Sequence, residues 1–319
     1  MQPFHHWRTA LSIAACLAFT APAAAADIVV GVPSWPSAQV TANVIASVIK
    51  TDLGVETELV DRGTMGILSG MATGETHIHP EVWFPNHKQA VERFNAKSNS
   101  IRVSPQGVAA TQNLCVTEAT AQNTGITNVA DLANPKIAAQ FDTDGDGKGE
   151  MWIGDQGWSS TNIERVRARS YGYDKTMTLL VEKEEVAMAA VDVAVSLEQP
   201  IVFYCYSPHH VFDLHKIRKL AEPAHDPATW TIVAPAADSD WLAKSKAETA
   251  WDLSHFHIAY AALLDAEHPK VAGFLRRITL EPEDAAAMSY AVQVERKTPA
   301  DAAAEWIAAN RNRIEEWVR

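Results

Sequence analysis

An acidic side chain and a tryptophan stand two residues apart in the segment Glu-Val-Trp-Phe-Pro-Asn, residues 81–86. Pro80 and Pro85 each disfavour helix in the residue before them, so the segment is predicted to be extended. Residues i and i+2 of an extended segment point to the same side, and we therefore expect Glu81 and Trp83 to face one common space. A carboxylate beside an indole face is suited to binding a cation.

Three more aromatic residues stand in loops rich in glycine, serine and proline, of the kind that end strands. They are Trp35 in Pro-Ser-Trp-Pro, Trp158 in Gln-Gly-Trp-Ser-Ser, and Tyr206 in Tyr-Cys-Tyr-Ser-Pro-His-His. With Trp83 they provide four aromatic walls, and with Glu81 they could form a cage for a methylated ammonium group. The alternative for each ring taken alone is an ordinary packing role, so the hypothesis depends on the whole set.

A second candidate site is the acidic, glycine-rich loop at residues 142–150. Aspartates stand at positions 1, 3 and 5 of an EF-hand-like pattern, but Ile153 replaces the bidentate glutamate of position 12, which excludes a complete EF-hand. Calcium prefers several oxygen ligands, and we predict a structural calcium ion here; solvated turns are the alternative. The predicted ligands are Asp142, Asp144, Asp146, the carbonyl group of Lys148, and Glu150.

Other chemistry has little support. His77 and His79 stand two apart on an extended segment, and no histidine or cysteine pair has a helical zinc spacing. Ser159 and Ser160 lack the flanking glycines of a nucleophile elbow. A calcium-dependent secreted hydrolase is the competing class of function, and it would need a nucleophile or an activated water that the sequence does not reveal.

The elements that would position the first site form a βαβαβ pattern. We predict strands at 28–32, 55–60 and 76–83, with a helix starting near Ser37 and ending at Gly54 between the first two, and a shorter helix after Gly63. Such a pattern gives a sheet with parallel strands, and ligands bind beyond the carboxyl ends of those strands. Trp35 and Trp83 are both placed there.

A second α/β unit follows from about residue 113. It has predicted strands at 113–116 and 201–204, and predicted helices at 161–171 and 183–197, the latter with Val186, Ala190, Val193 and Ala194 inward. The rest of the chain is predicted to be mostly helical, with helices at 240–250, 256–266, 269–277, 282–292 and 299–317. An inserted α/β unit flanked by two parts of another is the plan of a two-lobed solute-binding protein.

The amino terminus has the features of a secretory signal at residues 1–26, with Arg8 before an apolar run and an alanine-rich exit. A lipid anchor at Cys16 is a weaker alternative, and a periplasmic location is expected. The formal charge is −12, and it becomes −13 for residues 27–319, because the signal contains Arg8 and no acidic residue. This charge excludes a preference for nucleic acid or an anionic membrane.

The chain resembles the glycine betaine and trimethylammonium-compound binding proteins of ABC importers. The resemblance is carried by the segments 81–86, 141–149, 156–158, 204–210, 288–292 and 303–307. It implies a type II periplasmic binding-protein fold, with two lobes, a hinge of two crossing strands and a ligand cleft between the lobes. It also implies a membrane permease as partner, a monomeric state and no enzymatic activity; a sensing role that uses the same site stays open.

The resemblance also assigns residues to roles. Trp83, Trp158 and Tyr206 match the cage aromatics of the family, Trp35 matches more loosely, and His209 matches a histidine that in some members helps to hold a ligand carboxylate. We assign residues 27–112 and 207–319 to the first lobe and 113–206 to the second. Crossing strands in this fold run side by side, so a disulfide between Cys115 and Cys205 is predicted, with two buried free thiols as the alternative.

The solute is predicted from Glu81. A nearby carboxylate would disfavour glycine betaine, which carries its own carboxylate, unless Glu81 were protonated or turned away. Choline would be attracted by a charged Glu81. Trimethylamine N-oxide is small, and a protonated Glu81 could donate to its oxygen, so we favour the N-oxide, with glycine betaine, proline betaine or choline as the alternatives.

Overall fold

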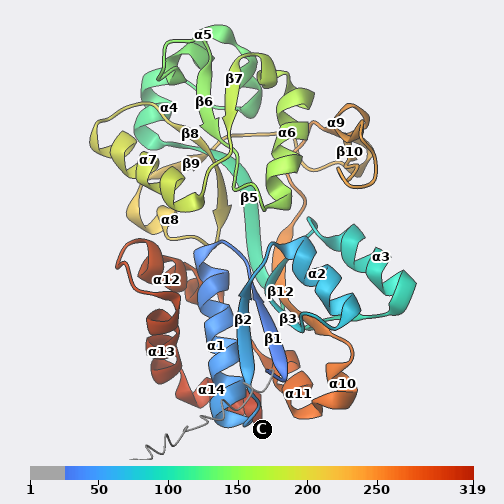
Figure 1. Ribbon diagram of the computed structural model, residues 1–319. Coiled ribbons are helices and arrows are strands. Elements are labelled where there is room, and N and C mark those ends of the chain that lie inside the picture. Colours follow the sequence, from blue (N-terminus) through green and yellow to red (C-terminus); the bar gives the residue numbers. More distant parts are fainter. Residues whose placement is uncertain (1–25) are drawn as a thin grey trace, which may run out of the picture.

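The computed structural model describes residues 26–319, which form two lobes joined by extended segments (Figure 1). The predicted signal at 1–26 and the alternative anchor at Cys16 lie outside the described residues, apart from Ala26. Over residues 26–319, no helix has both the length and the apolar character needed to cross a membrane. The expected two-lobed α/β architecture is confirmed.

The first lobe begins with the βαβαβ unit predicted from the sequence. Strand β1 lies between β2 and β3 in parallel, because each helix returns the chain to the same edge of the sheet. The elements are β1 (Ile28–Val32), α1 (Pro36–Asp52), β2 (Thr57–Asp61), α2 (Thr64–Thr73), β3 (Ile78–Phe84), α3 (Lys88–Ser98) and β4 (Ile101–Val103). Gly31 lets α2 approach closely, since a Cβ atom there would lie 2.5 Å from Ile67.

Strand β5 (Val108–Thr117) runs through both lobes, as the long strand at the centre of Figure 1 shows. Its first part pairs with β12 (Ser254–Ala261) in the first lobe, and its second part pairs with β8 (Val202–Ser207) in the second lobe. The sheet order is β2-β1-β3-β12-β5-β8-β6-β7. One mixed sheet therefore continues from lobe to lobe through a single strand.

The second lobe is built on parallel strands β6 (Gly149–Trp152) and β7 (Met177–Leu180), with β6 also parallel to β8. Its helices are α4 (Glu118–Thr124), α5 (Pro135–Ala138), α6 (Ser159–Tyr171) and α7 (Glu184–Ser196), with short 3-10 turns at Val129–Ala133, Ala139–Phe141 and Tyr173–Lys175. Helix α7 buries Ala187, Met188, Val191 and Ala194. Of the four residues predicted to face inward, only Ala194 is buried. Val186, Ala190 and Val193 are exposed, and the exposed fractions of Val186 and Val193 are 51% and 54%.

The predicted lobe boundary at residue 207 is wrong. After β8 the chain stays with the second lobe through α8 (Val211–Leu214), β9 (Ile217–Lys219), a 3-10 turn at Pro227–Thr229, β10 (Trp230–Thr231), α9 (Trp241–Lys244) and β11 (Lys246–Ala247). Leu220 and Trp251 belong to the second lobe's apolar core. The buried guanidinium of Arg167 on α6 pairs with Glu222 and donates to the carbonyl of Thr249 at 2.6 Å. The chain returns to the first lobe only at β12.

Two predicted helices are also wrong. Residues 256–266 contain strand β12, which pairs antiparallel with β3 and β5. The second half of this strand is buried on both faces, since Ala259 and Ala261 are as buried as Tyr260, and periodicity cannot distinguish such a continuous apolar run from a buried helix. Residues 240–250 contain only the single turn α9, and the following β11 pairs with β10.

The carboxyl-terminal helices cover the first lobe. They are α10 (Leu264–Glu267), α11 (Pro269–Arg277), α12 (Pro282–Gln293), α13 (Pro299–Ala309) and α14 (Arg311–Val318). Helices α12 and α13 pack against α1, on the face of the sheet opposite α2 and α3 (Figure 1). The predicted helix at 299–317 is interrupted at Asn310.

Candidate functional site

A cavity of about 40 Å³ lies between the two lobes. Its walls come from the ends of β1, β3 and β8 and from the starts of α2, α3 and α6, so both lobes contribute. The lining residues are Trp35, Thr64, Trp83, Asn86, His87, Gln112, Trp158, Ser159, Ser160, Tyr204 and Tyr206.

The structure brings the four predicted cage residues together at this cavity. The ring centroids of Trp35 and Trp158 lie 6.1 Å apart at an interplanar angle of 89°, and those of Trp83 and Tyr206 lie 5.5 Å apart at 86°. Trp158 and Tyr206 close a third corner at 5.8 Å and 82°. Rings at right angles to their neighbours enclose a space as the walls of a box do, and a methylated ammonium group can contact several ring faces at once.

Local sequence explains the position of each wall. Trp35 is the N-cap residue of α1 directly after β1, and Trp158 is the N-cap residue of α6; each adopts extended backbone angles before its helix begins. Trp83 lies near the end of β3, and Tyr206 near the end of β8. Strand ends of both lobes thus face the cleft, as expected for ligand sites in such sheets.

Glu81 does not share the common space with Trp83 that we expected. Its carboxyl group is 0% exposed and is not part of the cavity wall; it accepts hydrogen bonds from Trp35 Nε1 at 2.7 Å, Ser37 Oγ at 3.0 Å and Thr41 Oγ1 at 3.1 Å. The carboxyl therefore lies behind Trp35, against α1. The role predicted for Glu81, donation to a solute oxygen, is not compatible with this position.

A β-bulge explains why the side chain of Glu81 points toward α1 and not into the space that Trp83 faces. On β12 the residues His257 and Ala259 are two apart, but their partners on β3, Val82 and His79, are three apart. Two residues of β3, Pro80 and Glu81, therefore stand opposite one residue of β12, and a bulge of this kind re-aims side chains. Burial raises the pKa of Glu81 to about 7, against the three hydrogen bonds, which lower it.

His209 likewise lies behind the cage and does not line the cavity. Its Nε2 atom lies 2.5 Å from Oε1 of Glu184, and the hydroxyl of Tyr206 donates to the same oxygen at 2.7 Å. Glu184, a buried residue at the start of α7, was missed by the sequence analysis. Tyr204 was also missed, although it stands two residues before Tyr206 on an extended segment and this spacing predicts a shared face.

Polar groups complete the cavity wall. Trp158 Nε1 donates to Ser34 Oγ at 2.9 Å, and His87 Nε2 lies 3.0 Å from Ser159 Oγ, so each of these pairs connects one lobe to the other. Burial lowers the pKa of His87 to about 4, which keeps the imidazole neutral at pH 7. Trp158 provides no side-chain cap for α6, and the first N–H groups of a helix lack partners within it. A solute oxygen can accept hydrogen bonds at this end of the cavity.

The acidic loop brings together four carboxyl groups that could hold a cation. One carboxylate oxygen from each of Asp142, Asp144, Asp146 and Glu150 lies within 4.8 Å of the others. Oε1 of Glu150 is buried and has no hydrogen-bond partner among the described residues, so it is available to coordinate a cation. Gly145 and Gly147 adopt positive φ angles of 82° and 91°, so the loop curls around its own carboxylates. These residues fit the oxygen-ligand chemistry of calcium.

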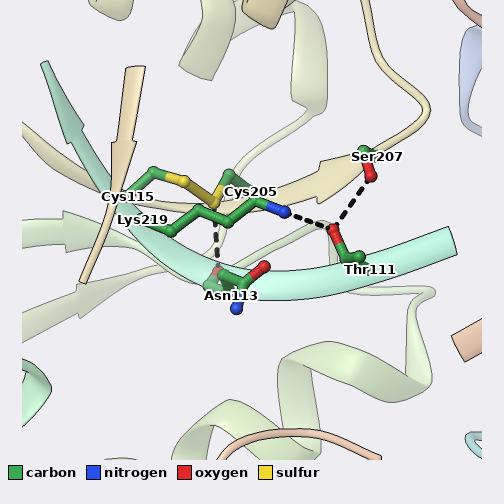
Figure 2. The surroundings of a disulfide bond; sticks show 6 residues. All are labelled: Thr111, Asn113, Cys115, Cys205, Ser207 and Lys219. Carbon is green, nitrogen blue, oxygen red and sulfur yellow. Dashed lines mark hydrogen bonds between the residues drawn. A yellow bond between two sulfur atoms is a disulfide. The ribbon is translucent and has the colours of Figure 1, made fainter. Parts of the chain in front are cut away.

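Cys115 and Cys205 are joined as a disulfide, with their Cα atoms 5.8 Å apart (Figure 2). The bond connects β5 to β8 directly before Tyr206. Nearby, Lys219 Nζ donates to Thr111 Oγ1 at 2.8 Å, and Thr111 Oγ1 lies 2.9 Å from Ser207 Oγ. The disulfide and the contact of Thr111 with Ser207 attach β8, the strand that carries Tyr206, to β5, which crosses between the lobes, and Lys219 attaches β9 to the same strand.

The chain is similar to known proteins in three comparisons: with a family model, with a relative in sequence, and with solved structures. Residues 26–309 match the family model described as the substrate binding domain of ABC-type glycine betaine transport system. The glycine betaine/proline betaine-binding periplasmic protein of Salmonella typhimurium is 23% identical over 254 residues, which cover 79% of this chain and 76% of that protein.

Two solved structures have the same fold. Lactococcal OpuAC, in its closed conformation complexed with glycine betaine, matches with a TM-score of 0.69 at 18% identity, over 92% of this chain and 99% of that chain. A choline binding protein of an ABC transporter, in complex with choline, matches with a TM-score of 0.70 at 16% identity, over 91% of this chain and 90% of that chain.

Proposed function

Because the chain belongs to the family of substrate-binding domains of ABC-type glycine betaine transport systems, we propose that it captures a small trimethylammonium solute between its lobes and delivers it to an ABC permease. The observation that carries this proposal is the set of four aromatic rings, two from each lobe, around one cavity. The family has a transport role, and we propose no catalytic step for this chain; the hydrolase alternative gains no support from the cavity.

Binding energy in this proposal comes from the rings and from closure of the lobes. Each aromatic face stabilises a desolvated ammonium group by roughly 0.5 to 2 kcal/mol. Trp35 and Trp83 belong to the first lobe and Trp158 and Tyr206 to the second, so only the closed arrangement offers all four faces to one solute. The bonds from Trp158 to Ser34 and between His87 and Ser159 then hold the lobes together.

Trimethylamine N-oxide is the solute that we propose. It is the smallest of the candidates, which suits a cage whose neighbouring ring centroids lie only 5.5 to 6.1 Å apart. Its single oxygen can accept from the first turn of α6, where Ser159 and Ser160 line the cavity. A donor at α6 replaces the donation from Glu81 that the sequence had led us to expect.

Glycine betaine is the alternative, supported by a different observation. Glu81 is turned toward α1, so the repulsion that we expected between it and a solute carboxylate is reduced. The carboxylate of glycine betaine would also suit the start of α6. Choline carries a hydroxyl in place of an anionic oxygen, and it gains less from that helix end; its support is the similarity to a protein solved with choline.

The proposed location is the periplasm, as the name of the Salmonella typhimurium relative states for that protein. The predicted signal at residues 1–26 is consistent with export. Calcium at the acidic loop is proposed as structural, with Asp142, Asp144, Asp146 and Glu150 as the ligands and the carbonyl of Lys148 as a possible fifth.

Calorimetric titration of the three solutes tests this function. The wild-type protein should bind trimethylamine N-oxide most tightly, and Trp83→Ala and Trp158→Ala should each weaken binding by about 2 kcal/mol, or about thirtyfold, the cost of removing a central tryptophan anchor. Trp241→Ala, the same change on α9 outside the cavity, is the matched control and should leave affinity unchanged. Absence of heat with all three solutes would overturn the proposal, and tighter binding of glycine betaine would transfer it to the alternative.

A further inference from the structure

A buried carboxyl group holds one wall of the cage from behind. Glu184 begins α7 and is 3% exposed, and its Oε1 atom accepts the hydrogen bond of the Tyr206 hydroxyl at 2.7 Å. The Val211 N–H donates to Nδ1 of His209 at 3.1 Å, so in the neutral ring Nε2 carries the hydrogen and donates to the same carboxylate oxygen at 2.5 Å. Glu184 contacts Tyr206 but does not line the cavity.

The first lobe has the same arrangement. Trp35 lines the cavity, and its Nε1–H donates to the buried carboxyl of Glu81 at 2.7 Å. Each lobe therefore contributes one ring whose polar hydrogen points away from the cavity and ends on a buried acid. Neither acid touches the cavity, and each acts on a solute only through its ring and through its charge.

We propose that Glu184 is a positioning residue that, through Tyr206, makes the cage prefer a positively charged head over a neutral head of the same shape. This inference rests on the proposed function. A phenol that donates to a carboxylate holds more electron density, which strengthens the negative face of its ring and the attraction of that face for a cation. The hydrogen bond also fixes the ring before the solute arrives, so less ordering is needed on binding.

The contribution of charge can be isolated with carbon isosteres. Replacing the trimethylammonium nitrogen by carbon gives 3,3-dimethylbutanoate for glycine betaine and 3,3-dimethylbutan-1-ol for choline. For trimethylamine N-oxide it gives tert-butanol, whose oxygen also carries a hydrogen in place of the negative charge, a difference that is the same for every variant of the protein. The two members of each pair have nearly the same shape. The dissociation constant of the carbon isostere divided by that of the ammonium compound is a ratio that reports how strongly the cage selects the positive charge. A loss of packing alone would weaken both members of a pair and leave the ratio unchanged.

The experiment measures this ratio by calorimetry for whichever pair the wild-type protein binds best. Glu184→Gln should lower the ratio about tenfold. Glu185→Gln removes the same charge from the next residue of α7, which is exposed, and should leave the ratio unchanged. An unaltered ratio in Glu184→Gln, or an equal loss in both variants, would overturn the inference.

A double-mutant cycle tests whether Glu184 acts through the tyrosine. Tyr206→Phe keeps the ring and removes the hydroxyl, and it should lower the ratio by a similar factor; adding Glu184→Gln to it should change the ratio less than twofold. If Glu184→Gln does not fold, Tyr206→Phe alone decides, because an unaltered ratio there contradicts the inference. A wild-type protein that binds no trimethylammonium solute would instead overturn the proposed function itself.

Discussion

At the scale of single residues, the proposed cage depends on side chains that do not line its cavity. Trp35 is held by Glu81 and Tyr206 by Glu184, and both carboxyl groups are buried. An isolated buried charge is costly, but Glu81 accepts three hydrogen bonds that offset part of this cost. The arrangement fixes the two rings from behind, and in the proposed function it places two carboxyl groups near the cationic head of the solute.

Glu81 should make the stability of the protein depend on pH. Its pKa in the folded state is about 7, above the ordinary value of 4.5, because burial disfavours the charged form. The stabilisation is therefore fully present below pH 4.5 and is lost as the pH rises through 7, by about 3.5 kcal/mol at 1.4 kcal/mol per pH unit. Glu81→Gln should remove this loss.

Denaturant titrations of wild type and Glu81→Gln at several pH values measure the effect, and the difference between the two proteins is the relevant quantity. Buried His87, whose pKa is lowered to about 4, changes stability in the opposite sense as the pH falls below 6.5, but it is present in both proteins and cancels. A difference that stays constant from pH 4.5 to 8 would contradict the assigned state of Glu81.

At the scale of elements, the sequence could predict which aromatic residues lie together only where the direction of the chain alone decides their position. Residues that follow strands of a parallel sheet meet at one edge, so Trp35 and Trp83 could be placed together from the βαβαβ pattern. The direction of Glu81 could not be predicted, because the bulge at Pro80 and Glu81 exists only opposite β12. We had expected a helix for that segment, which removed the partner strand from consideration.

Glu184 could not be found for a related reason. It stands 22 residues before Tyr206, and only the antiparallel packing of α7 against β8 in the second lobe, which puts the start of the helix beside the end of the strand, brings the two side chains together. The segment gives no metal spacing and no short motif. Contacts of this kind depend on tertiary structure, which periodicity in the sequence does not specify.

The acidic loop between α5 and β6 gives a prediction about stability. A calcium ion that binds only the folded state stabilises it by about 2.7 kcal/mol at a hundredfold excess over the dissociation constant. Chelation should therefore lower the melting temperature, and Asp144→Ala should abolish this chelator-sensitive part without preventing solute binding. Asp174→Ala removes an exposed acid elsewhere in the second lobe and is the matched control. Chelation should lower its melting temperature by as much as it lowers that of the wild-type protein.

Differential scanning calorimetry with and without a chelator measures this directly. Superimposable curves for the wild-type protein would remove the calcium proposal. Loss of solute binding in Asp144→Ala at a temperature where the variant is folded would contradict the purely structural role.

At the scale of the whole molecule, the two lobes are linked at few places, and the solute site is where they meet. Strand β5 and the return into β12 carry the chain between the lobes (Figure 1), and the disulfide from Cys115 to Cys205 holds β8 to β5 beside this crossing. The lobe plan could be predicted from the inserted α/β unit. The length of the insertion could not be predicted, because no local pattern attaches residues 208–252 to the second lobe. They are held to α6 by the buried ion pair between Arg167 and Glu222 and by hydrogen bonds of α6 with Thr249 and Trp251.

The central claim is that rings from both lobes enclose a trimethylammonium group, and a crystal structure of the protein with trimethylamine N-oxide tests it most directly. The account predicts that the solute nitrogen lies within about 6 Å of the ring centroids of Trp35, Trp83, Trp158 and Tyr206, the range of a cation–π contact, with the solute oxygen at the start of α6. A solute bound elsewhere, or one enclosed by rings of a single lobe, would contradict it.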